Sequence, residues 1–594
     1  MCGIVGCILK NNKKAVPILF ESISRLQYRG YDSIGIATLD EKINIKKDKG
    51  KVEETYDISD FHDMGGSCGI AHIRWATHGF PSKINAHPHC DEKENIAIVH
   101  NGIIENYLLI KEFLENKGYI FKSDTDSEVI AHLIEYYMNN KLDFESAFNE
   151  TINDLDGSYT IVAISKKEQN KIIASCKDSP LILGIGRDGY YLASDSLAVL
   201  EYTNKIIYFE NDETVIVTSA DFIIKNKDGD FVDKEIKTIN LSSEIAKKDG
   251  YDYFMLKEIN EQADVVRNTL NEMDNIKKIV NDVKDNINRI YFVSCGTSYH
   301  ASLIGKYLIE SLSNIPTQSI LASEFKYCVN TLDENTLVIG ISQSGETRDT
   351  INAIKLAKSF SKTISIVNAP ESLLSRNSDY IIYTQAEPEI AVAATKTYLS
   401  QLTCIYILAA YISKNNKLLS EISEVPNYIE EVLKNTLKIK EMSTKYKYAD
   451  NLFFIGRGYA YPIALEGALK LKEITYIHAE GYAAGELKHG PLALIDHKFP
   501  VIAIVPPGEE HEKTMININE IKSRGGDIIS LGSTEDNDLE IESTDYYGIN
   551  PNVSEILSPL VYIIPLQILS YFIAIERGED PDKPRNLSKT VTVD

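Results

Sequence analysis

Cys2 places a reactive group at the start of the chain. It follows the initiator methionine directly and is small enough for that methionine to be trimmed, which would leave a thiol and a free amine on one residue. An α-amine titrates at about pH 8 and a thiol at about pH 8.5, so the amine can act as a general base for the sulfur. Position alone leaves a second interpretation open, in which Cys2 is an ordinary residue at the start of an apolar strand, residues 4–9.

A turn rich in hydroxyl groups, residues 342–347, follows an aliphatic stretch and precedes a helical one. It offers three hydroxyls, one side-chain amide and a glycine at the place where a helix begins, and the free amides of a helix N-terminus bind anions. Residues 295–298 form a second hydroxyl-bearing turn after a neighbouring strand. The nucleotide motif GxxxxGKS/T is absent from this turn, and the lack of its lysine suits a monophosphate. We expect a phosphate site, although two ordinary Ser/Thr helix caps remain the alternative.

Three charged residues, Glu466, Lys470 and Glu473, share one face of a predicted helix, since they stand at positions i, i+4 and i+7. Pro462 suits the first turn of that helix. A stripe of this kind is usually a solvated row of ion pairs. Carboxylate, ammonium and imidazole groups together can also move protons between adjacent carbons, and the loop after the helix adds Glu480, Glu486, Lys488 and His489.

Histidines and a cysteine crowd into the first hundred residues, and a zinc site is the tempting alternative there. No four of these side chains show a recognised metal-site spacing. We therefore predict neither a metal nor another cofactor. The residues are His72, His78, His87, His89, Cys90 and His100.

The end of the chain, residues 582–594, is an extended, proline-containing tail. Tails are normally disordered. Lys589 would on that basis be an ordinary surface lysine.

The composition is that of a multidomain protein. A length of 594 residues predicts two to four domains. A net charge of −24 argues against a general nucleic-acid binder or a peripheral membrane protein, since both need a basic field. Eight scattered cysteines and the lack of a signal peptide indicate reduced thiols in the cytoplasm. Residues 556–575 are apolar enough to span a membrane, but two prolines and several polar residues favour a buried helical region.

The first 240 residues read as short strands interrupted by a few helices, which indicates a layered α+β domain. Strands are expected at residues 4–9, 35–39, 68–74, 95–100, 159–165, 171–175 and 214–217, and helices near 15–26, 105–117 and 126–138.

From about residue 280 onward, aliphatic strands alternate with helices, which is typical of a parallel sheet covered on both faces. This half contains a repeat, because residues 289–296 resemble 451–458 and residues 337–345 resemble 500–508 at almost the same separation. Residues 506–509 lack the hydroxyls of the first copy, so one phosphate site is expected for the two units. We predict domains at 1–240, 276–430 and 440–575, with a connection at 241–275 and a tail at 576–594.

These motifs together resemble those of the glutamine–fructose-6-phosphate aminotransferase (isomerising) family, and the resemblance runs from end to end. It implies an α+β N-terminal-nucleophile glutaminase domain with αββα layers, followed by two α/β doubly wound SIS (sugar isomerase) domains. The matching segments are residues 2–6, 28–33, 72–79, 100–102, 342–347, 466–490 and 589–594.

The resemblance implies that L-glutamine and D-fructose 6-phosphate are the substrates and that D-glucosamine 6-phosphate is the product, the first step of the amino-sugar nucleotide pathway. In the first domain it makes Cys2 the nucleophile on the glutamine side-chain amide, with Asn101 and Gly102 as the oxyanion hole. Glutamine would be bound by Arg74, Thr77, His78 and Asp126, and Trp75 would gate an internal ammonia channel.

In the second half, the resemblance makes Lys589 the residue that forms an imine with the sugar, His489 the ring-opening acid/base and Glu473 the base between C1 and C2. It also implies a homodimer in which His489 reaches the neighbouring subunit's site. The sugar phosphate would be bound by Ser298, Ser342, Gln343, Ser344, Thr347, Val392, Ala393, Glu466 and Lys470.

Two other functions were weighed against this one. Another amidotransferase with an N-terminal nucleophile, such as a phosphoribosyl-transfer enzyme, would need a diphosphate-recognising acidic loop in place of the repeat. A non-catalytic sugar-phosphate sensor built from SIS domains would give Cys2, Glu473, His489 and Lys589 no reason to occur together.

Overall fold

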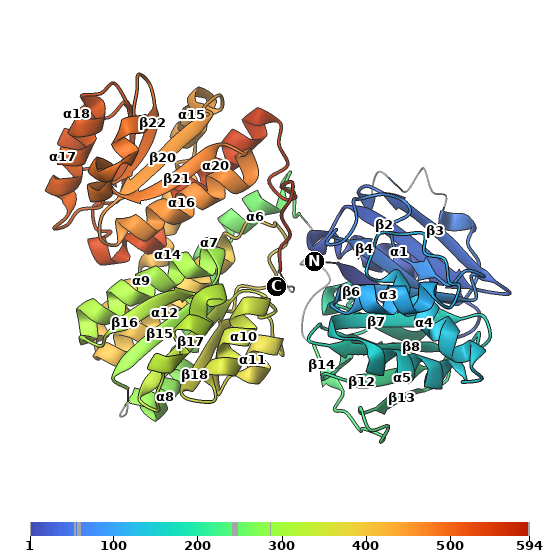
Figure 1. Cartoon of the computed structure of the whole chain (residues 1–594). Coiled ribbons are helices and arrows are strands. Elements are labelled where there is room, and N and C mark those ends of the chain that lie inside the picture. Colours follow the sequence, from blue (N-terminus) through green and yellow to red (C-terminus); the bar gives the residue numbers. More distant parts are fainter. Residues whose placement is uncertain (1, 53–54, 56–60, 240–247, 285–286, 592–594) are drawn as a thin grey trace. The chain divides into compact units, whose positions relative to one another are not determined.

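The computed structural model of the chain (Figure 1) describes residues 2–52, 55, 61–239, 248–284 and 287–591. The chain divides into two compact units, Met1–Lys247 with Ser588–Asp594, and Lys248–Leu587. The start of the predicted connection, residues 241–247, lies outside the described residues, and the predicted domain limits stay predictions.

The first unit contains two stacked antiparallel sheets. In β1 successive side chains point to opposite faces, so Ile4 and Ile8 enter the core between the sheets while Val5 and Cys7 face α1 (Ala15–Ser24). The eight-stranded sheet has the order β14 (Lys237–Thr238), β11 (Lys205–Tyr208), β9 (Ile182–Ile185), β10 (Gly189–Ala193), β1 (Gly3–Leu9), β4 (Cys68–Arg74), β2 (Ser33–Leu39) and β3 (Ile43–Lys49).

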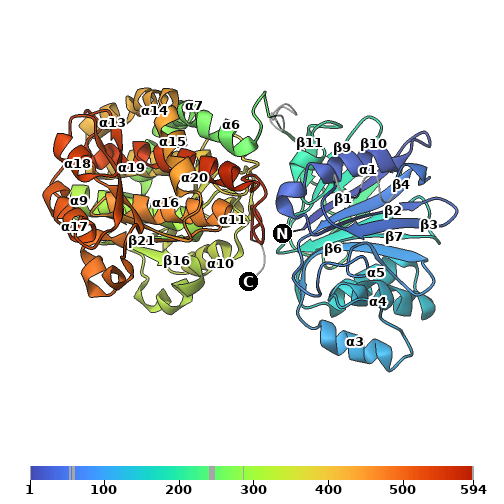
Figure 2. The same ribbon diagram turned by 90° about the horizontal axis from the view of Figure 1, so that it is seen from above.

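Helices cover the outer face of each sheet and complete four layers. Figure 2 shows α1 on one side of the strands and α4 and α5 on the other. The predicted αββα fold is confirmed. The six-stranded sheet has the order β13 (Phe222–Lys225), β12 (Glu213–Val217), β8 (Ile172–Lys177), β7 (Gly157–Ser165), β6 (Ile96–Ile104) and β5 (His89–Cys90), and the helices beside it are α3 (Tyr107–Glu115), α4 (Glu128–Asn139) and α5 (Phe144–Asp154).

The second unit contains two parallel five-stranded sheets whose strand orders correspond one to one, which confirms the predicted duplication. In each sheet the first strand along the chain lies between the second and the third. The sheets are β16 (Thr317–Leu321), β15 (Arg289–Ser294), β17 (Thr336–Ser342), β18 (Lys362–Val367) and β19 (Tyr380–Tyr383), and β21 (His478–Ala483), β20 (Asn451–Gly456), β22 (Pro500–Ile504), β23 (Asp527–Ser533) and β24 (Asp545–Ile549).

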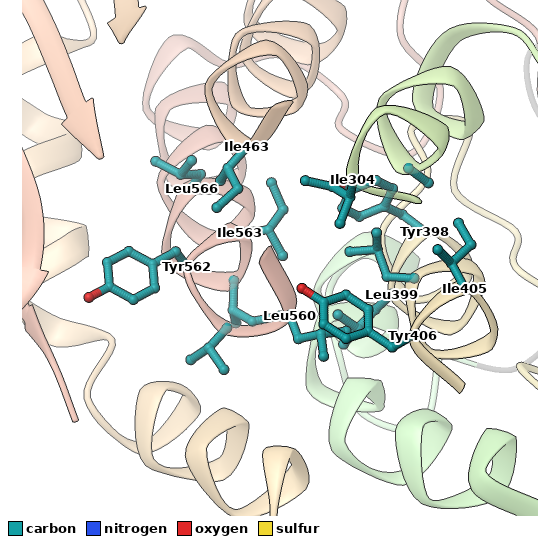
Figure 3. Close-up of a cluster of buried hydrophobic side chains, with 14 of the residues drawn as sticks. Ile304, Tyr398, Leu399, Ile405, Tyr406, Ile463, Leu560, Tyr562, Ile563 and Leu566 are labelled. Carbon is teal, nitrogen blue, oxygen red and sulfur yellow. The ribbon is translucent and has the colours of Figure 1, made fainter. Parts of the chain in front are cut away.

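Helices of both repeats share one hydrophobic core, in which Ile304 and Tyr398 from the first repeat lie near Ile463 and Ile563 from the second (Figure 3). The apolar segment Glu555–Arg577 is long enough to cross a membrane, but 89% of its most apolar window is buried in this core. The helices are α6 (Phe254–Asn260), α7 (Gln262–Thr269), α8 (Met273–Val283), α9 (Gly296–Ser313), α10 (Arg348–Ala357), α11 (Leu373–Asn377), α12 (Lys396–Ser413), α13 (Asn416–Ile422), α14 (Val425–Lys434), α15 (Leu437–Tyr446), α16 (Ala460–Thr475), α17 (His511–Lys522), α18 (Asn537–Glu542), α19 (Ser558–Val561) and α20 (Ile563–Arg577).

The segment after α20 is fastened to the second unit by backbone hydrogen bonds. The Asp582 carboxylate accepts hydrogen bonds from the N–H groups of Phe254 and Met255, both at 2.8 Å, and so caps the start of α6. Its carbonyl accepts from Val392 N at 3.0 Å. The first part of the predicted tail is therefore an ordered part of the fold.

Candidate active sites

Cys2 lies immediately before β1, beside the end of β4. Trp75 N–H donates to Cys2 Sγ at 3.2 Å, and Arg29 Nε donates to the Cys2 carbonyl at 3.2 Å. Burial raises the pKa of the Cys2 thiol, while the Trp75 N–H and the Arg74 guanidinium lower it in part. A thiol in this state needs a base before it becomes a nucleophile. Met1 lies outside the described residues, so the prediction that a free amine on Cys2 is that base stays a prediction.

Asn101 and Gly102 come from β6, in the other sheet, and Asn101 reaches Cys2. The Asn101 Nδ2 donates to the Cys2 carbonyl at 3.1 Å. Gly102 has φ +123°, and a Cβ there would lie 2.0 Å from the Ser158 carbonyl oxygen, so only glycine fits. A side-chain amide and a backbone N–H next to each other, close to a thiol, suit the stabilisation of a negatively charged oxygen.

Arg74, the last residue of β4, offers an unused hydrogen-bond donor. Its Nη2 donates to the carbonyls of His78 and Gly79, which holds the guanidinium in place. Its Nη1 is buried and has no hydrogen-bond partner among the described residues. Because a buried donor without a partner costs free energy, this atom is suited to a carboxylate ligand.

Asp126 supplies the opposite charge in the same region. One of its carboxylate oxygens accepts from Ile104 N at 2.8 Å, and the carboxylate raises the pKa of the Arg74 guanidinium, which burial lowers overall. His78 is half-buried with its ring 5.4 Å from that of Tyr107, whereas Thr77 is exposed. An ammonium and a carboxylate of one amino acid could pair with these two charges.

Trp75, directly after Arg74, is half-buried and makes an edge-to-face ring contact with Tyr31 at 5.7 Å. Its backbone N–H donates to Cys2 Sγ, so this residue lies directly beside the nucleophile. The structure places Trp75 beside Cys2, and its role as a gate stays a prediction.

Four buried histidines of the first unit form a neutral polar cluster, in which His72 lies between the two sheets and the His100 ring contacts Ser127 at the start of α4. Burial lowers the pKa of His72 to about 3, and burial also lowers the pKa values of the other three. The rings of His72 and His87 stack at 4.0 Å. Across the described part of the chain, no group of three or more His, Cys, Asp or Glu side chains is arranged so that it could hold a metal ion. The cluster consists of His72, His87, His89 and His100.

The hydroxyl-rich turn lies between the end of β17 and the start of α10, as predicted from the sequence. Ser342 Oγ and Thr347 Oγ1 are 2.8 Å apart, and Ser344 Oγ accepts from Glu346 N at 3.1 Å. Gly345 has φ +63°, and a Cβ there would lie 2.0 Å from a side-chain oxygen. The turn therefore curls tightly around its own hydroxyls at a helix N-terminus, where an anion is favoured.

Gln343 and Ser344 of this turn are half-buried, and so is Ser298 in the first turn of α9. Strands β15 and β17 are parallel neighbours. The two helices that follow them, α9 and α10, therefore begin at the same edge of the sheet. The predicted phosphate residues come to one edge.

The charged face of α16 is buried, which corrects the alternative of a solvated ion-pair row. Glu466 and Lys470 are fully buried. The Lys470 Nζ lies 2.6 Å from Glu473 Oε2 and 3.4 Å from Glu466 Oε1. Burial alone would lower the pKa of Lys470, but the two carboxylates raise it above its ordinary value. Glu473 is the more accessible carboxylate, with 18% of its side chain exposed.

Two residues of α9, Thr297 and His300, also contact these charged side chains, and the sequence analysis does not predict them as site residues. His300 Nδ1 lies 2.7 Å from Glu466 Oε2. Thr297 Oγ1 donates to Glu466 Oε1 at 3.1 Å and accepts from Lys470 Nζ at 3.1 Å. The available signal was the spacing of Thr297 and His300, one helical turn apart just after the second hydroxyl turn.

The remaining predicted site residues lie elsewhere. Val392 and Ala393 are buried in the segment before α12, with Val392 bonded to Asp582. His489 ends a 3-10 helix, Ala484–His489, and is exposed. Lys589 belongs to the first unit, where its backbone N–H donates to the Tyr28 carbonyl at 3.3 Å.

Comparison with protein families identifies both halves of the chain. A glutamine amidotransferase domain matches residues 72–201, and an SIS domain matches twice, at residues 285–411 and 445–577. The two SIS matches coincide with the duplicated parallel sheets.

Curated relatives match over their whole length. The protein named glutamine–fructose-6-phosphate aminotransferase (isomerizing) of Methanothermobacter thermautotrophicus is 53% identical over 594 residues, covering 100% of both chains. The protein of the same name from Thermococcus kodakarensis is 45% identical over 607 residues, again covering 100% of both.

Solved structures resemble the second half. The C-terminal domain of glucosamine-fructose-6-phosphate aminotransferase from Francisella tularensis is 37% identical, with a TM-score of 0.54, and covers 57% of this chain and 100% of that one. Tagatose-6-phosphate ketose/aldose isomerase from Escherichia coli shares the fold, with 17% identity and a TM-score of 0.51 over 56% of this chain and 96% of its own.

Proposed function

Because the chain belongs to the family of isomerising glutamine–fructose-6-phosphate aminotransferases, we propose that its two units divide one reaction between them. The enzyme transfers the amide nitrogen of L-glutamine to D-fructose 6-phosphate and isomerises the product to D-glucosamine 6-phosphate, with L-glutamate released. The main support for assigning the glutaminase reaction to the first unit is the hydrogen bond from the Asn101 side-chain amide to the Cys2 carbonyl.

In the first unit, Cys2 Sγ attacks the side-chain amide carbon of glutamine. The oxygen of the tetrahedral intermediate is then stabilised by Asn101 Nδ2 and Gly102 N–H, each of which can contribute about 3 kcal/mol. Collapse of the intermediate breaks the C–N bond, and the nitrogen leaves as ammonia after taking up a proton. Water then hydrolyses the thioester to glutamate and restores the thiol.

Glutamine is selected by its α-carboxylate and its α-ammonium. The Arg74 Nη1, which lacks a hydrogen-bond partner among the described residues, suits the carboxylate, and Asp126 suits the ammonium. Thr77 and His78 line the same loop. This geometry explains why a free amino acid, with both charges on one carbon, is the nitrogen donor.

In the second unit, the sugar phosphate lies at the turns of residues 295–298 and 342–347, with Val392 and Ala393 at its border. Ring opening by His489, which is exposed in the single chain and reaches the site of the neighbouring subunit in a homodimer, frees the carbonyl. We propose that Lys589, whose backbone is part of the first unit in this structure, forms the imine with that carbonyl. Glu473 moves the proton between C1 and C2, and Lys470 and Glu466 hold its charge and orientation.

Ammonia passes from the first site to the second through an internal channel that Trp75 gates. Its position next to the Cys2 thiol supports this role. The enzyme works in the cytoplasm, in keeping with eight cysteines that are all free of disulfide bonds.

The direct test is to incubate the purified protein with both substrates and to measure the amino sugar phosphate and glutamate. Equal amounts of D-glucosamine 6-phosphate and L-glutamate are expected, with neither formed from glutamine and fructose 6-phosphate in buffer alone. Intact glutamine and no amino sugar would refute the proposal.

A further inference from the structure

His72 lies between the two sheets of the first unit, at the point where they bring the nucleophile and the oxyanion donors together. It belongs to β4 and is paired with Ile4 of β1, so it shares a sheet with the strand that begins after Cys2. Its side chain is fully buried and points to β6 of the other sheet. There its Nε2 lies 3.1 Å from Asn101 Oδ1 and 3.0 Å from the His100 carbonyl oxygen.

The partners of the ring decide which nitrogen of His72 carries the proton. The His100 carbonyl can only accept a hydrogen bond, so Nε2 must be the donor. The Nδ1 is buried and has no hydrogen-bond partner among the described residues. Burial lowers the pKa of the ring to about 3, so the imidazole is neutral, with its single proton on Nε2. Stacking on His87 at 4.0 Å fixes the plane of the ring.

The same hydrogen bond decides which way the Asn101 carboxamide faces. In the observed orientation Oδ1 accepts from His72 and Nδ2 donates to the Cys2 carbonyl at 3.1 Å. A flip of the amide would turn its NH₂ group towards the His72 Nε2–H, donor against donor, and its oxygen towards the Cys2 carbonyl, acceptor against acceptor. A flipped Asn101 would also present an oxygen to the oxyanion instead of a donor.

We propose that His72 is the positioning residue of the oxyanion hole, whose Nε2–H holds the Asn101 carboxamide with its NH₂ group towards Cys2. This inference rests on the proposed glutaminase function, and it adds a residue that touches neither glutamine nor the thiol. His72 also links the sheet that carries Cys2 to the sheet that carries Asn101. The orientation of the Asn101 carboxamide relative to Cys2 thus depends on the inter-sheet hydrogen bond from His72.

Two polar substitutions at position 72 test the direction of that bond. In His72→Gln the side-chain amide can place an N–H near the position of Nε2, whereas in His72→Asn the shorter amide places it near Nδ1, which faces no partner among the described residues. His72→Gln should keep the glutaminase kcat within about tenfold of the parent enzyme. His72→Asn should lower it by about 100-fold, the loss expected when an oxyanion donor is misplaced, with the KM for glutamine within about threefold.

The pH profile separates positioning from proton transfer. If the ring stays neutral in the working range, the kcat of the parent enzyme divided by the kcat of His72→Asn should be constant between about pH 6 and pH 9. A double variant closes the cycle. In an Asn101→Ala background, which has already lost the donor, His72→Asn should lower kcat by less than about threefold more.

The outcomes separate the two levels of the argument. The role of His72 alone would be overturned if His72→Gln and His72→Asn lost the same amount of kcat, or if the loss appeared in the KM for glutamine. It would also be overturned if the kcat ratio changed with pH, or if His72→Asn lowered kcat by the full 100-fold in the Asn101→Ala background. A parent enzyme without glutaminase activity would overturn the proposed function itself. Glutamine-free sugar isomerisation, which takes place in the second unit, should be unchanged in both His72 variants. An unchanged urea midpoint of Trp75 fluorescence would report that the first unit is folded.

Discussion

The two candidate sites differ in the groups that hold their reacting residues. Beside Cys2, the oxyanion amide of Asn101 is held by the imidazole of His72, which burial keeps uncharged, and the buried Arg29 donates to the Cys2 carbonyl. Around Glu473 the buried groups are full charges, with Lys470 between two carboxylates and its pKa raised. Each arrangement suits its reaction, because an oxyanion needs fixed dipoles that do not move, whereas proton transfer needs groups that change charge.

The comparison also shows how each site is held together. The glutaminase site depends on hydrogen bonds between two sheets of one domain, such as that of Asn101 with Cys2. The isomerase site depends on ion pairs within α16 and on contacts between the two repeated domains, since His300 Nδ1 of α9 lies 2.7 Å from Glu466 Oε2 of α16. Loss of a neutral partner should therefore alter geometry, while loss of a charged partner should also leave an uncompensated buried charge.

The largest expected effect is that of Cys2→Ala on glutamine use. Without the thiol there is no covalent intermediate, and the glutaminase rate should fall by roughly 10⁴-fold or more. Isomerisation of fructose 6-phosphate should continue, since the charged network of the second unit is untouched. Separate assays of glutamate release and of sugar isomerisation measure this, and loss of both activities would contradict the division of labour.

Lys470→Met should break the charged site and also destabilise its domain. Removal of the ammonium leaves the buried Glu466 and the partly exposed Glu473 without their shared cation, which should cost about 3–5 kcal/mol of unfolding free energy and abolish isomerisation. Glutaminase activity should survive. Thermal and urea unfolding measure the loss.

Lys472→Met is the matched control, because Lys472 lies on the same helix but is exposed. Its unfolding free energy should change by less than about 0.5 kcal/mol. Equal stability of the two variants would mean that the buried charges of α16 do not stabilise one another.

Arg74→Lys should weaken glutamine binding more than it slows the reaction. A lysine cannot reproduce the fork that reaches both the loop carbonyls and the α-carboxylate, and a lost charged hydrogen bond corresponds to an increase of about 10- to 100-fold in the KM for glutamine. The KM for fructose 6-phosphate serves as the internal control. An unchanged glutamine KM with a lowered kcat would place Arg74 at the reacting amide instead.

Acid should destabilise the first unit through its neutral histidines. Their folded-state pKa values lie below the unfolded value of about 6.5, so the unfolded chain binds protons first as the pH falls. Their contribution is complete above about pH 6.5 and is lost as the pH drops towards 3, with a slope of up to about 1.4 kcal/mol per pH unit for each histidine.

The sole tryptophan, Trp75, belongs to the first unit, so its fluorescence during urea unfolding reports on that unit. The urea concentration at the unfolding midpoint should decrease as the pH is lowered from about 6.5 to about 5. The decrease should be less steep in a His87→Asn variant. A midpoint that rises on acidification would contradict a neutral histidine cluster.

The sequence predicts the fold best where one apolar pattern decides it. Strand β4 has the predicted limits, Cys68–Arg74, because it is an aliphatic run flanked by glycines on one side and a loop on the other. Strand β6 was predicted to end at His100 but continues to Ile104. Asn101 and Gly102 do not look like strand residues, and pairing with β7 holds them there.

The candidate sites show the same limit. The spacing of Glu466, Lys470 and Glu473 correctly puts them on one face, but spacing cannot show that this face is buried. Burial depends on α9, which lies far away in the sequence and contributes His300. Long-range packing of this kind, and the proton position on His72, have no local signal in the chain.

The central claim is that nitrogen leaves glutamine at Cys2 and reaches the sugar inside the protein. Glutamine labelled with ¹⁵N in its side-chain amide, fructose 6-phosphate and an excess of unlabelled ammonium would be incubated with the enzyme, and the D-glucosamine 6-phosphate analysed by mass spectrometry. The account predicts that nearly all of the amino sugar carries ¹⁵N. Product that carries mainly unlabelled nitrogen would contradict it.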